Sequence, residues 1–213
     1  LTHRNLVSNV IASRSIIRMH RTDRFLSILP LAHTYECTLG FINAVAQGSS
    51  VWYLDKPPVA SVLLPALQQV KPTIILSVPL IIEKIYRASV LPTLQKMSLY
   101  RHEWLRPLLH RLAGLKLKKT FGGHVRFFGI GGSAVAPDVE AFLLAAHFPY
   151  SIGYGLTETA PLLAGSAPYH TVLRSTGPAL KGVEIRIAEP KPDTGEGGIQ
   201  ARGPNVMQGY YKD

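Results

Sequence analysis

Residues 153–159 bring together the residue types that a nucleotide–metal site requires. Their sequence, GYGLTET, holds the aromatic ring of Tyr154, two glycines, two threonines and the carboxylate of Glu158. A tyrosine ring can stack on a base, a threonine hydroxyl can reach a phosphate, and a carboxylate can hold Mg²⁺ beside it. An apolar run precedes the stretch, which predicts that it lies where a strand leaves a sheet. In open α/β sheets, ligands bind at that edge.

A second candidate site is the glycine-rich turn at residues 129–134, GIGGSA, which follows an apolar run and precedes a helical one. Its spacing matches the G-x-G-x-x-A form of the dinucleotide-binding fingerprint. The same glycines would also form a tight strand–helix turn with no ligand. Pro137 predicts that the helix begins about three residues after the glycines, so its N-terminus need not point at a pyrophosphate. Beside residues 153–159, on a neighbouring strand, the turn could hold one face of a nucleotide.

The remaining chemistry-bearing residues give weaker signals. His33 lies in residues 29–36, LPLAHTYE, where a lone histidine near a helix start is usually a cap or a hydrogen-bonded core group. Cys37 is the single cysteine, which excludes an internal disulfide framework and suits a reducing cytoplasm. No Cys/His cluster has zinc-ligand spacing, and no G-x-S-x-G motif supports a Ser-His-Asp hydrolase.

Composition describes a folded, core-rich chain with a basic surface. Of 213 residues, 46% are hydrophobic, and no apolar run reaches the roughly 18–20 residues of a spanning helix. Lys and Arg number 23 against 13 Asp and Glu, for a net charge of +10, and much of the excess lies between Lys96 and Lys119. Such a surface attracts nucleic acid, anionic lipid headgroups or phosphate-rich cofactors, and charge alone does not choose among them.

The elements that position these residues alternate along the chain. Apolar runs predict strands at 25–29, 51–54, 73–78, 125–130 and 150–153, and helical spacing predicts helices at 5–20, 33–47, 59–70, 79–88 and 138–146. This alternation is typical of parallel βαβ units, so we expect an α/β fold with a mainly parallel sheet flanked by helices.

Two segments depart from this alternation. Residues 91–120 predict an amphipathic, basic helical insertion, whose apolar face would hold Leu105, Leu108, Leu112 and Leu115. Beyond Thr171 the chain changes character, because residues 183–187 and 198–202 predict two strands that pair across a Pro/Gly/Asp turn. The C-terminal end is therefore expected to be a short β-rich segment.

The whole chain resembles the adenylate-forming (AMP-binding) superfamily, and specifically its long-chain fatty acid–CoA ligases. The YGLTE run is the most specific of the matching motifs, and the His-x-x-Glu form around His33 is similar to the long-chain branch. The resemblance rests on residues 1–6 (LTHRNL), 29–36, 127–134 (FFGIGGSA), 153–158, 197–207 (GGIQARGPNVM) and 209–211 (GYY).

The resemblance implies a two-step reaction. A fatty acid carboxylate attacks the α-phosphorus of Mg·ATP to give an acyl adenylate and pyrophosphate, and the thiol of CoA then displaces AMP. It implies an adenine and nucleotide site made by Gly131, Gly132, Ser133, Tyr154, Gly155 and Leu156, with the Tyr154 ring stacked on the base. Thr157 would contact the α-phosphate, Glu158 would ligate Mg²⁺, and His33 would border the acyl pocket near the reacting carboxylate.

The resemblance also implies that parts of the enzyme lie outside this chain. The phosphate loop would precede Leu1, and the ribose-binding aspartate, the hinge and the C-terminal lobe with its catalytic lysine would follow Asp213. We therefore expect an α/β adenylate-binding subdomain at residues 1–170, the start of the next subdomain at 171–213, and no turnover by this chain alone.

Three alternative functions stay open, and so does the role of the basic insertion. An acyl–carrier-protein ligase of the same superfamily would share these motifs. An NAD-binding oxidoreductase would rest on the glycine turn alone, and a basic nucleic-acid-binding domain on the charge alone. The basic insertion is a solvated helical face, a contact with an anionic membrane surface, which would make a cytoplasmic protein peripheral to the membrane, or, third, a binding site for CoA phosphates.

Overall fold

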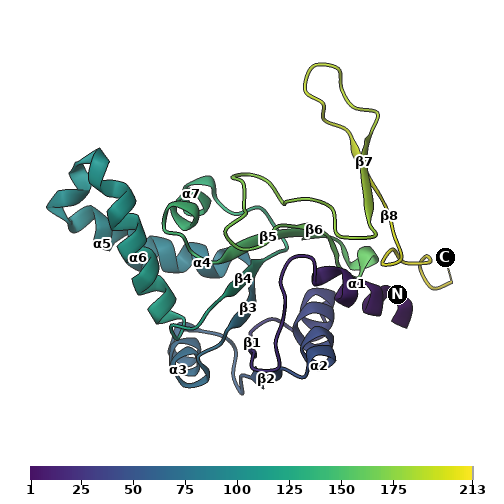
Figure 1. Cartoon of the computed structure of the whole chain (residues 1–213), viewed down its shortest axis with the longest axis horizontal. Coiled ribbons are helices and arrows are strands. Elements are labelled where there is room, and N and C mark those ends of the chain that lie inside the picture. Colours follow the sequence, from purple (N-terminus) through teal and green to yellow (C-terminus); the bar gives the residue numbers. More distant parts are fainter. Residues whose placement is uncertain (213) are drawn as a thin grey trace.

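A six-stranded sheet forms the centre of the computed structural model, which describes residues 1–212 (Figure 1). The strand order is β2-β1-β3-β4-β5-β6; the first five strands in this order are parallel and β6 runs antiparallel to β5. This confirms the predicted α/β fold with a mainly parallel sheet. The strands are β1 (Arg24–Ser27), β2 (Ser50–Tyr53), β3 (Ile74–Ser77), β4 (Phe127–Ile130), β5 (Tyr150–Gly155) and β6 (Leu162–Gly165).

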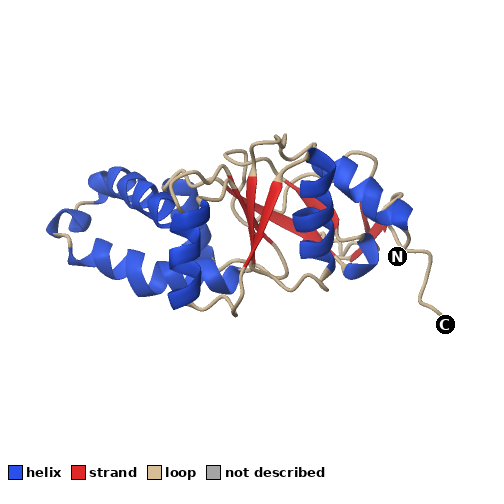
Figure 2. Ribbon diagram, turned by 90° about the horizontal axis from the view of Figure 1, so that it is seen from below, coloured by secondary structure: helices blue, strands red, loops and turns tan. Residues whose placement is uncertain are grey.

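The central strands β1, β3 and β4 are almost entirely buried because both faces of the sheet are covered there (Figure 2). Successive residues contribute to opposite cores: Leu26, Ile75 and Phe128 pack in the larger cluster, and their neighbours Phe25, Ile74 and Phe127 in the smaller one. Helices α3 (Ala60–Val70), α4 (Pro79–Ile85), α6 (Arg106–Thr120) and α7 (Pro137–Ala145) supply the first cluster, and α1 (His3–Ser13) with residues 39 and 44 the second.

Helix α1 is shorter than the predicted helix at 5–20. It ends at Ser13, and the hydroxyls of Ser13 and Ser15 donate to the carbonyls of Val10 and Ala12. Serine hydroxyls that bond nearby carbonyls compete with the helical hydrogen-bond ladder, which favours an end there.

The predicted helix at 33–47 is helical but is not an α-helix for most of its length. A π-helix covers Tyr35–Ile42 and continues into the short α2 (Asn43–Gln47), which stops at Gly48 in the left-handed region at φ 70°, as predicted. Gly40 suits the wide turn because a Cβ there would lie 2.8 Å from Oε1 of Glu36. π-Helices are rare, and the single-turn π-bulges in which they mostly occur are frequent at functional sites.

Residues 91–120 are helical as predicted, but the predicted apolar face of the last helix is wrong. A π-turn at Tyr86–Val90 leads into α5 (Leu91–Lys96), two 3₁₀ turns follow at Ser98–Arg101 and Glu103–Leu105, and α6 closes the segment. The face of α6 that packs inward holds Leu109, Gly114 and Leu117, and a Cβ at Gly114 would lie 2.4 Å from the carbonyl oxygen of Ala146. Leu108, Leu112 and Leu115 are instead exposed.

The C-terminal strands pair as predicted. Strands β7 (Glu184–Ala188) and β8 (Gly198–Arg202) form an antiparallel hairpin that projects from the body of the molecule (Figure 1). The chain after the hairpin returns to the body, where the Asn5 amide donates to the carbonyls of Pro204 and Val206, both at 2.8 Å.

Candidate nucleotide and acyl site

Strands β4 and β5 lie side by side in parallel, with Phe128 opposite Tyr150 and Ile130 opposite Ile152. The glycine turn follows β4 and residues 156–159 follow β5, so both segments lie at the carboxyl edge of the sheet. The sequence prediction that neighbouring strand ends bring these two segments to one edge is confirmed.

Each glycine of the first turn is favoured for a different structural reason. Gly132 is exposed and needs its left-handed φ of 96°, with no atom closer than 3.8 Å to a Cβ there. Gly131 is buried, its N–H donates to the Ser77 carbonyl at 3.1 Å, and a Cβ on it would lie 3.3 Å from the Tyr35 ring. Gly129 likewise makes room for the Tyr35 hydroxyl. The backbone that stays open to a ligand is therefore that of Gly132 and the exposed Ser133.

Tyr154 and Gly155 lie within β5, two residues beyond the predicted strand end at 153. Tyr154 pairs with Ala164 of β6, and its half-buried ring packs on the smaller core. A Cβ on Gly155 would lie 1.9 Å from the Pro161 carbonyl oxygen, so only glycine fits there. The antiparallel partner β6, which the sequence analysis did not predict, thus fixes both residues.

Thr157 and Glu158 lie in a single 3₁₀ turn, Thr157–Thr159, directly after the strand. The hydroxyl of Thr159 closes the turn, because the N–H of Leu156 donates to it at 3.0 Å. Leu156 and Thr157 are exposed, so the Thr157 hydroxyl is available to a ligand.

Glu158 is held by the chain that follows the hairpin. Its carbonyl accepts from the N–H of Met207 at 2.8 Å, and its Oε1 accepts from the hydroxyl of Tyr210 at 2.7 Å. The Tyr210 hydrogen bond lowers the pKa of the Glu158 carboxyl below its ordinary value, so the group is ionised at neutral pH.

The donor set at Glu158 fits Mg²⁺ held jointly with a nucleotide. The carboxylate is solvent-accessible and ionised, and among residues 1–212 its Oε2 has no hydrogen-bond partner. Within the same residues, no group of three His, Cys, Asp or Glu side chains could enclose a metal by itself. Mg²⁺ commonly binds through one or two carboxylates together with substrate phosphates, which matches a lone carboxylate.

His33 lies two residues before the first residue of the π-helix, Tyr35, and is exposed. Its Nδ1 accepts from the N–H of Tyr35 at 3.1 Å, and its carbonyl accepts from the N–H of Cys37 at 2.9 Å. The His33 side chain therefore accepts from the N–H of the first π-helical residue, although the N-cap position itself is Thr34. Through Tyr35, which packs on Gly129 and Gly131, this segment also contacts the glycine turn.

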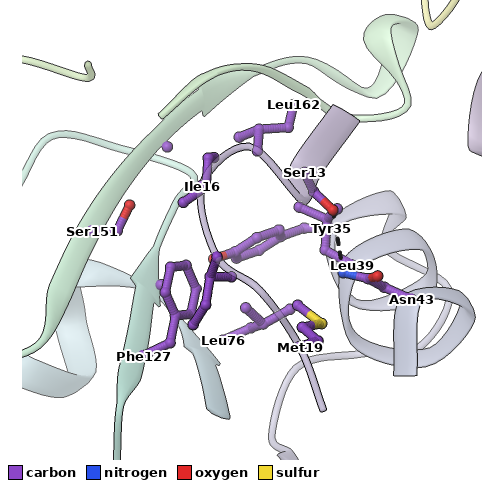
Figure 3. A pocket seen from close by; sticks show the side chains of 13 residues that line it. Ser13, Ile16, Met19, Tyr35, Leu39, Asn43, Leu76, Phe127, Ser151 and Leu162 are labelled. Atoms are coloured by element: carbon purple, nitrogen blue, oxygen red, sulfur yellow. Dashed lines mark hydrogen bonds between the residues drawn. The ribbon is translucent and has the colours of Figure 1, made fainter. Parts of the chain in front are cut away.

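A small apolar cavity of about 30 Å³ lies next to these segments, between the end of α1, the π-helix and strands β4 and β5. This volume is close to that of one water molecule. Tyr35 lies at the centre of the cavity wall, facing Phe127, Leu76 and Ile16 (Figure 3). The few polar groups at the wall include Ser13 and Asn43, which are joined by a hydrogen bond of 3.3 Å (Figure 3).

Glu36 is the residue of this region to which sequence reasoning gave no role of its own. Its side chain is buried, with a relative exposure of 3%, and Oε2 has no hydrogen-bond partner. Burial raises the pKa of Glu36 to about 7, although the nearby Ser27 hydroxyl acts in the opposite direction. Buried oxygens of Thr34, Thr38 and Asn43 also lack partners. A glutamate inside the apolar helical run 35–45 was the available signal.

Comparison with known proteins identifies a family and similar sequences. The sequence profile described as AMP-binding enzyme matches residues 1–211. A peroxisomal long chain acyl-CoA synthetase of Arabidopsis thaliana is 29% identical over 249 residues, which cover 100% of this chain and 34% of the relative. A chloroplastic long-chain-fatty-acid–[acyl-carrier-protein] ligase of the same plant is 28% identical over 271 residues, covering 100% of this chain and 36% of the relative.

Solved structures show the same fold. O-succinylbenzoate coenzyme A synthetase from Bacillus subtilis, in complex with ATP and magnesium ion, superposes with a TM-score of 0.73 at 21% identity, covering 100% of this chain and 39% of that one. This chain thus spans about a third of the length of the curated relatives. In residues 1–212, every helix is too short or too polar to cross a membrane. The match over residues 1–211 shows that the chain belongs to the AMP-binding enzyme family.

Proposed function

We propose that this chain is part of the adenylate-forming lobe of an AMP-forming long-chain fatty acid–CoA ligase. The observation that carries the proposal is the juxtaposition of the glycine turn and the YGLTE stretch at the ends of β4 and β5. A dinucleotide-binding oxidoreductase would use the glycine turn alone. That turn is already explained in part by the packing of Tyr35 on Gly129 and Gly131.

The residues take the following roles in the proposal. Backbone at Gly132 and Ser133 lies along the adenine, with the buried Gly131 supporting the turn from behind, and Tyr154 stacks on the base beside Gly155 and Leu156. Thr157 donates its hydroxyl to the α-phosphate, and Glu158 holds Mg²⁺, which supplies charge neutralisation at the phosphates. These groups orient the nucleotide relative to the fatty acid carboxylate; the chemistry requires such positioning more than proton transfer.

The apolar cavity beside Tyr35 is proposed to receive the acyl chain. Its wall is mostly apolar, and it lies between the segment that carries His33 and the segment that carries Tyr154. The cavity volume is about 30 Å³, so the proposal expects the cavity to widen, by movement of lining side chains such as Tyr35, when a fatty acid enters.

The thiol acceptor is proposed to be CoA, with an acyl carrier protein as the second candidate. Both kinds of ligase occur among the relatives at similar identity, 29% and 28%. Measuring thioester formation by the longer enzyme with CoA and with an acyl carrier protein distinguishes the two.

The first experiment tests ligand binding by this chain. A thermal-shift panel would compare AMP, a non-hydrolysable acyl adenylate analogue and NAD, with Tyr154→Ala and, as matched control, the exposed Tyr53→Ala. A ligand at about 100 times its Kd adds about 2.7 kcal/mol of stability. Stabilisation by the adenylate analogue that is lost only in Tyr154→Ala is expected. Stabilisation by NAD alone would contradict the proposal.

The second experiment tests catalysis. This chain alone is expected to give no ATP–pyrophosphate exchange with any fatty acid, and clear exchange would refute the proposal that turnover needs the rest of the enzyme. In the longer enzyme, Glu158→Gln is expected to lower adenylation strongly and to weaken its Mg²⁺ dependence. Glu184→Gln on the exposed hairpin is the control. An unchanged Mg²⁺ dependence in Glu158→Gln would remove Glu158 as a metal ligand.

A further inference from the structure

Helix α6 carries leucines on two opposite faces, although only one of them packs on the protein. Leu109 and Leu117 are buried against the core. Leu108, Leu112 and Leu115, at spacings of four and three, form a stripe on the opposite face with exposed fractions of 55%, 53% and 66%. The core therefore accounts for one apolar face of α6 and leaves the other in solvent.

An exposed tryptophan continues this stripe beyond the start of the helix. Trp104 lies in the 3₁₀ turn just before α6 and is 76% exposed. Tryptophan and leucine side chains together are typical of helices that lie in a membrane interface. We call Trp104, Leu108, Leu112 and Leu115 the outer stripe.

Cations flank the outer stripe on both sides. At about 100° per residue, Arg111 and Lys118 fall on one side of Leu108, Lys116 falls on the other, and Lys119 lies at its C-terminal end. Residues 96–119 hold one carboxylate, Glu103, which pairs with Arg106 at 3.4 Å. The outer stripe is thus an apolar band bordered by positive charge.

The outer stripe belongs to a helical arm at one end of the molecule. Helices α5 and α6 extend from the sheet at the end opposite the β7–β8 hairpin (Figure 1). Figure 2 shows the same arm standing clear of the sheet. The arm therefore lies apart from the hairpin, at the other end of the molecule.

We propose that the outer face of α6 docks on the surface of an anionic phospholipid membrane. The leucines and Trp104 would enter the boundary between headgroups and acyl chains, while Arg111, Lys116 and Lys119 would contact headgroup phosphates. Charge complementarity selects an anionic surface, and the apolar band selects lipid over nucleic acid, because phosphate contacts alone give no use to three exposed leucines. The proposal is independent of the adenylation site.

Vesicle co-sedimentation of this chain tests the proposal. Vesicles of phosphatidylcholine are compared with vesicles that also contain phosphatidylserine, at low and high salt. We expect at least tenfold stronger partition onto the anionic vesicles, weakened by salt. The triple variant Leu108→Ser, Leu112→Ser, Leu115→Ser is expected to bind the anionic vesicles at least tenfold more weakly than the parent chain. Its control is Leu64→Ser with Leu80→Ser, two exposed leucines elsewhere, which should bind as the parent does.

A spectroscopic readout keeps the test independent of folding. Trp52 and Trp104 are the two tryptophans, so Trp52→Phe leaves Trp104 as the reporter. Its emission should shift to the blue with anionic vesicles and stay unchanged when Lys116→Glu and Lys119→Glu are added. No binding, equal binding to both vesicle types, or wild-type binding by the triple variant would overturn the proposal. Two further results would overturn the proposal. The first is that this chain forms a dimer that the triple substitution dissociates, and the second is that a longer enzyme containing this chain does not bind the vesicles.

Discussion

Substitution of Glu36 by Gln should make this fold more stable at alkaline pH. The Glu36 carboxyl is buried in the π-helix beside Tyr35 and Cys37, and one of its oxygens has no hydrogen-bond partner. The pKa of the Tyr53 hydroxyl, on β2, is raised mainly by burial and additionally by the negative charge of Glu36. Ionised Glu36 is therefore the unfavourable form in the folded state.

The magnitude follows from the pKa of Glu36. Its folded value is about 7, against an ordinary value of 4.5. Between these values the folded state keeps a proton that the unfolded state releases, so the free energy of unfolding falls as pH rises. A difference of about 2.5 in pKa, at about 1.4 kcal/mol for each pKa unit, gives about 3 kcal/mol. This contribution is fully present below the unfolded pKa and is lost as pH rises through about 7.

Urea unfolding of the parent chain and of Glu36→Gln, at several pH values between about 4.5 and 8, measures this loss. Gln imitates the protonated carboxyl, so the two proteins should differ by less than about 1 kcal/mol at the acid end. The variant should be about 3 kcal/mol more stable at the alkaline end. Subtracting the two curves removes titrations that both proteins share. Glu184→Gln, on the exposed hairpin, should show no such divergence, and a difference independent of pH would refute the reasoning.

Three further stability predictions follow from packing. Gly155→Ala should destabilise the fold by about 3 kcal/mol, because its Cβ would lie 1.9 Å from a carbonyl oxygen of the chain entering β6; a neutral result in urea unfolding would contradict this packing. Asp23→Ala should cost about 3 kcal/mol, because it leaves the Arg126 guanidinium without its buried carboxylate partner, and a double variant that also replaces Arg126 should recover part of the loss. Leu117→Ala should cost about 2–5 kcal/mol, whereas Leu115→Ala should stay within about 0.5 kcal/mol; equal losses would show that the two faces of α6 are misassigned.

The sequence predicted the parallel strands of the sheet but not its complete set of strands. Continuous apolar runs such as the one around Ile74 predict parallel strands covered on both faces, and the structure has them. Strand β6 was missed because it is short, follows Pro161, and is defined by antiparallel pairing to β5 rather than by its own periodicity. Strand pairing depends on tertiary contacts, so a four-residue run of leucine, alanine and glycine does not by itself predict a strand.

The assignment of faces on α6 failed for a different reason. Leucines at 105, 108, 112 and 115 have helical spacing, but so do those at 109 and 117, and periodicity cannot decide which set packs inward. The close approach of Gly114 to the Ala146 carbonyl decides it in the structure. A helix with two apolar faces is therefore a signal to examine both, since one of them needs another explanation.

The residue types predicted where the candidate site lies but did not predict its local geometry. The sequence located both segments at one sheet edge, yet the predicted strand ended at Gly153, before Tyr154 and Gly155, and Glu36 was given no role. Tyr154 is fixed by β6, and the pKa of Glu36 is set by burial, so both depend on contacts that are distant in sequence.

The position of Tyr35 links the two halves of the candidate site. Its ring forms part of the wall of the apolar cavity and also packs on Gly129 and Gly131, where a Cβ would come close to the ring. Under the proposed function, an acyl chain that enters the cavity contacts this ring, so the acyl chain and the glycine turn share one packing partner. The proposal therefore predicts that occupation of the cavity alters the conformation of the glycine turn, because the ring that lines the cavity also packs on that turn.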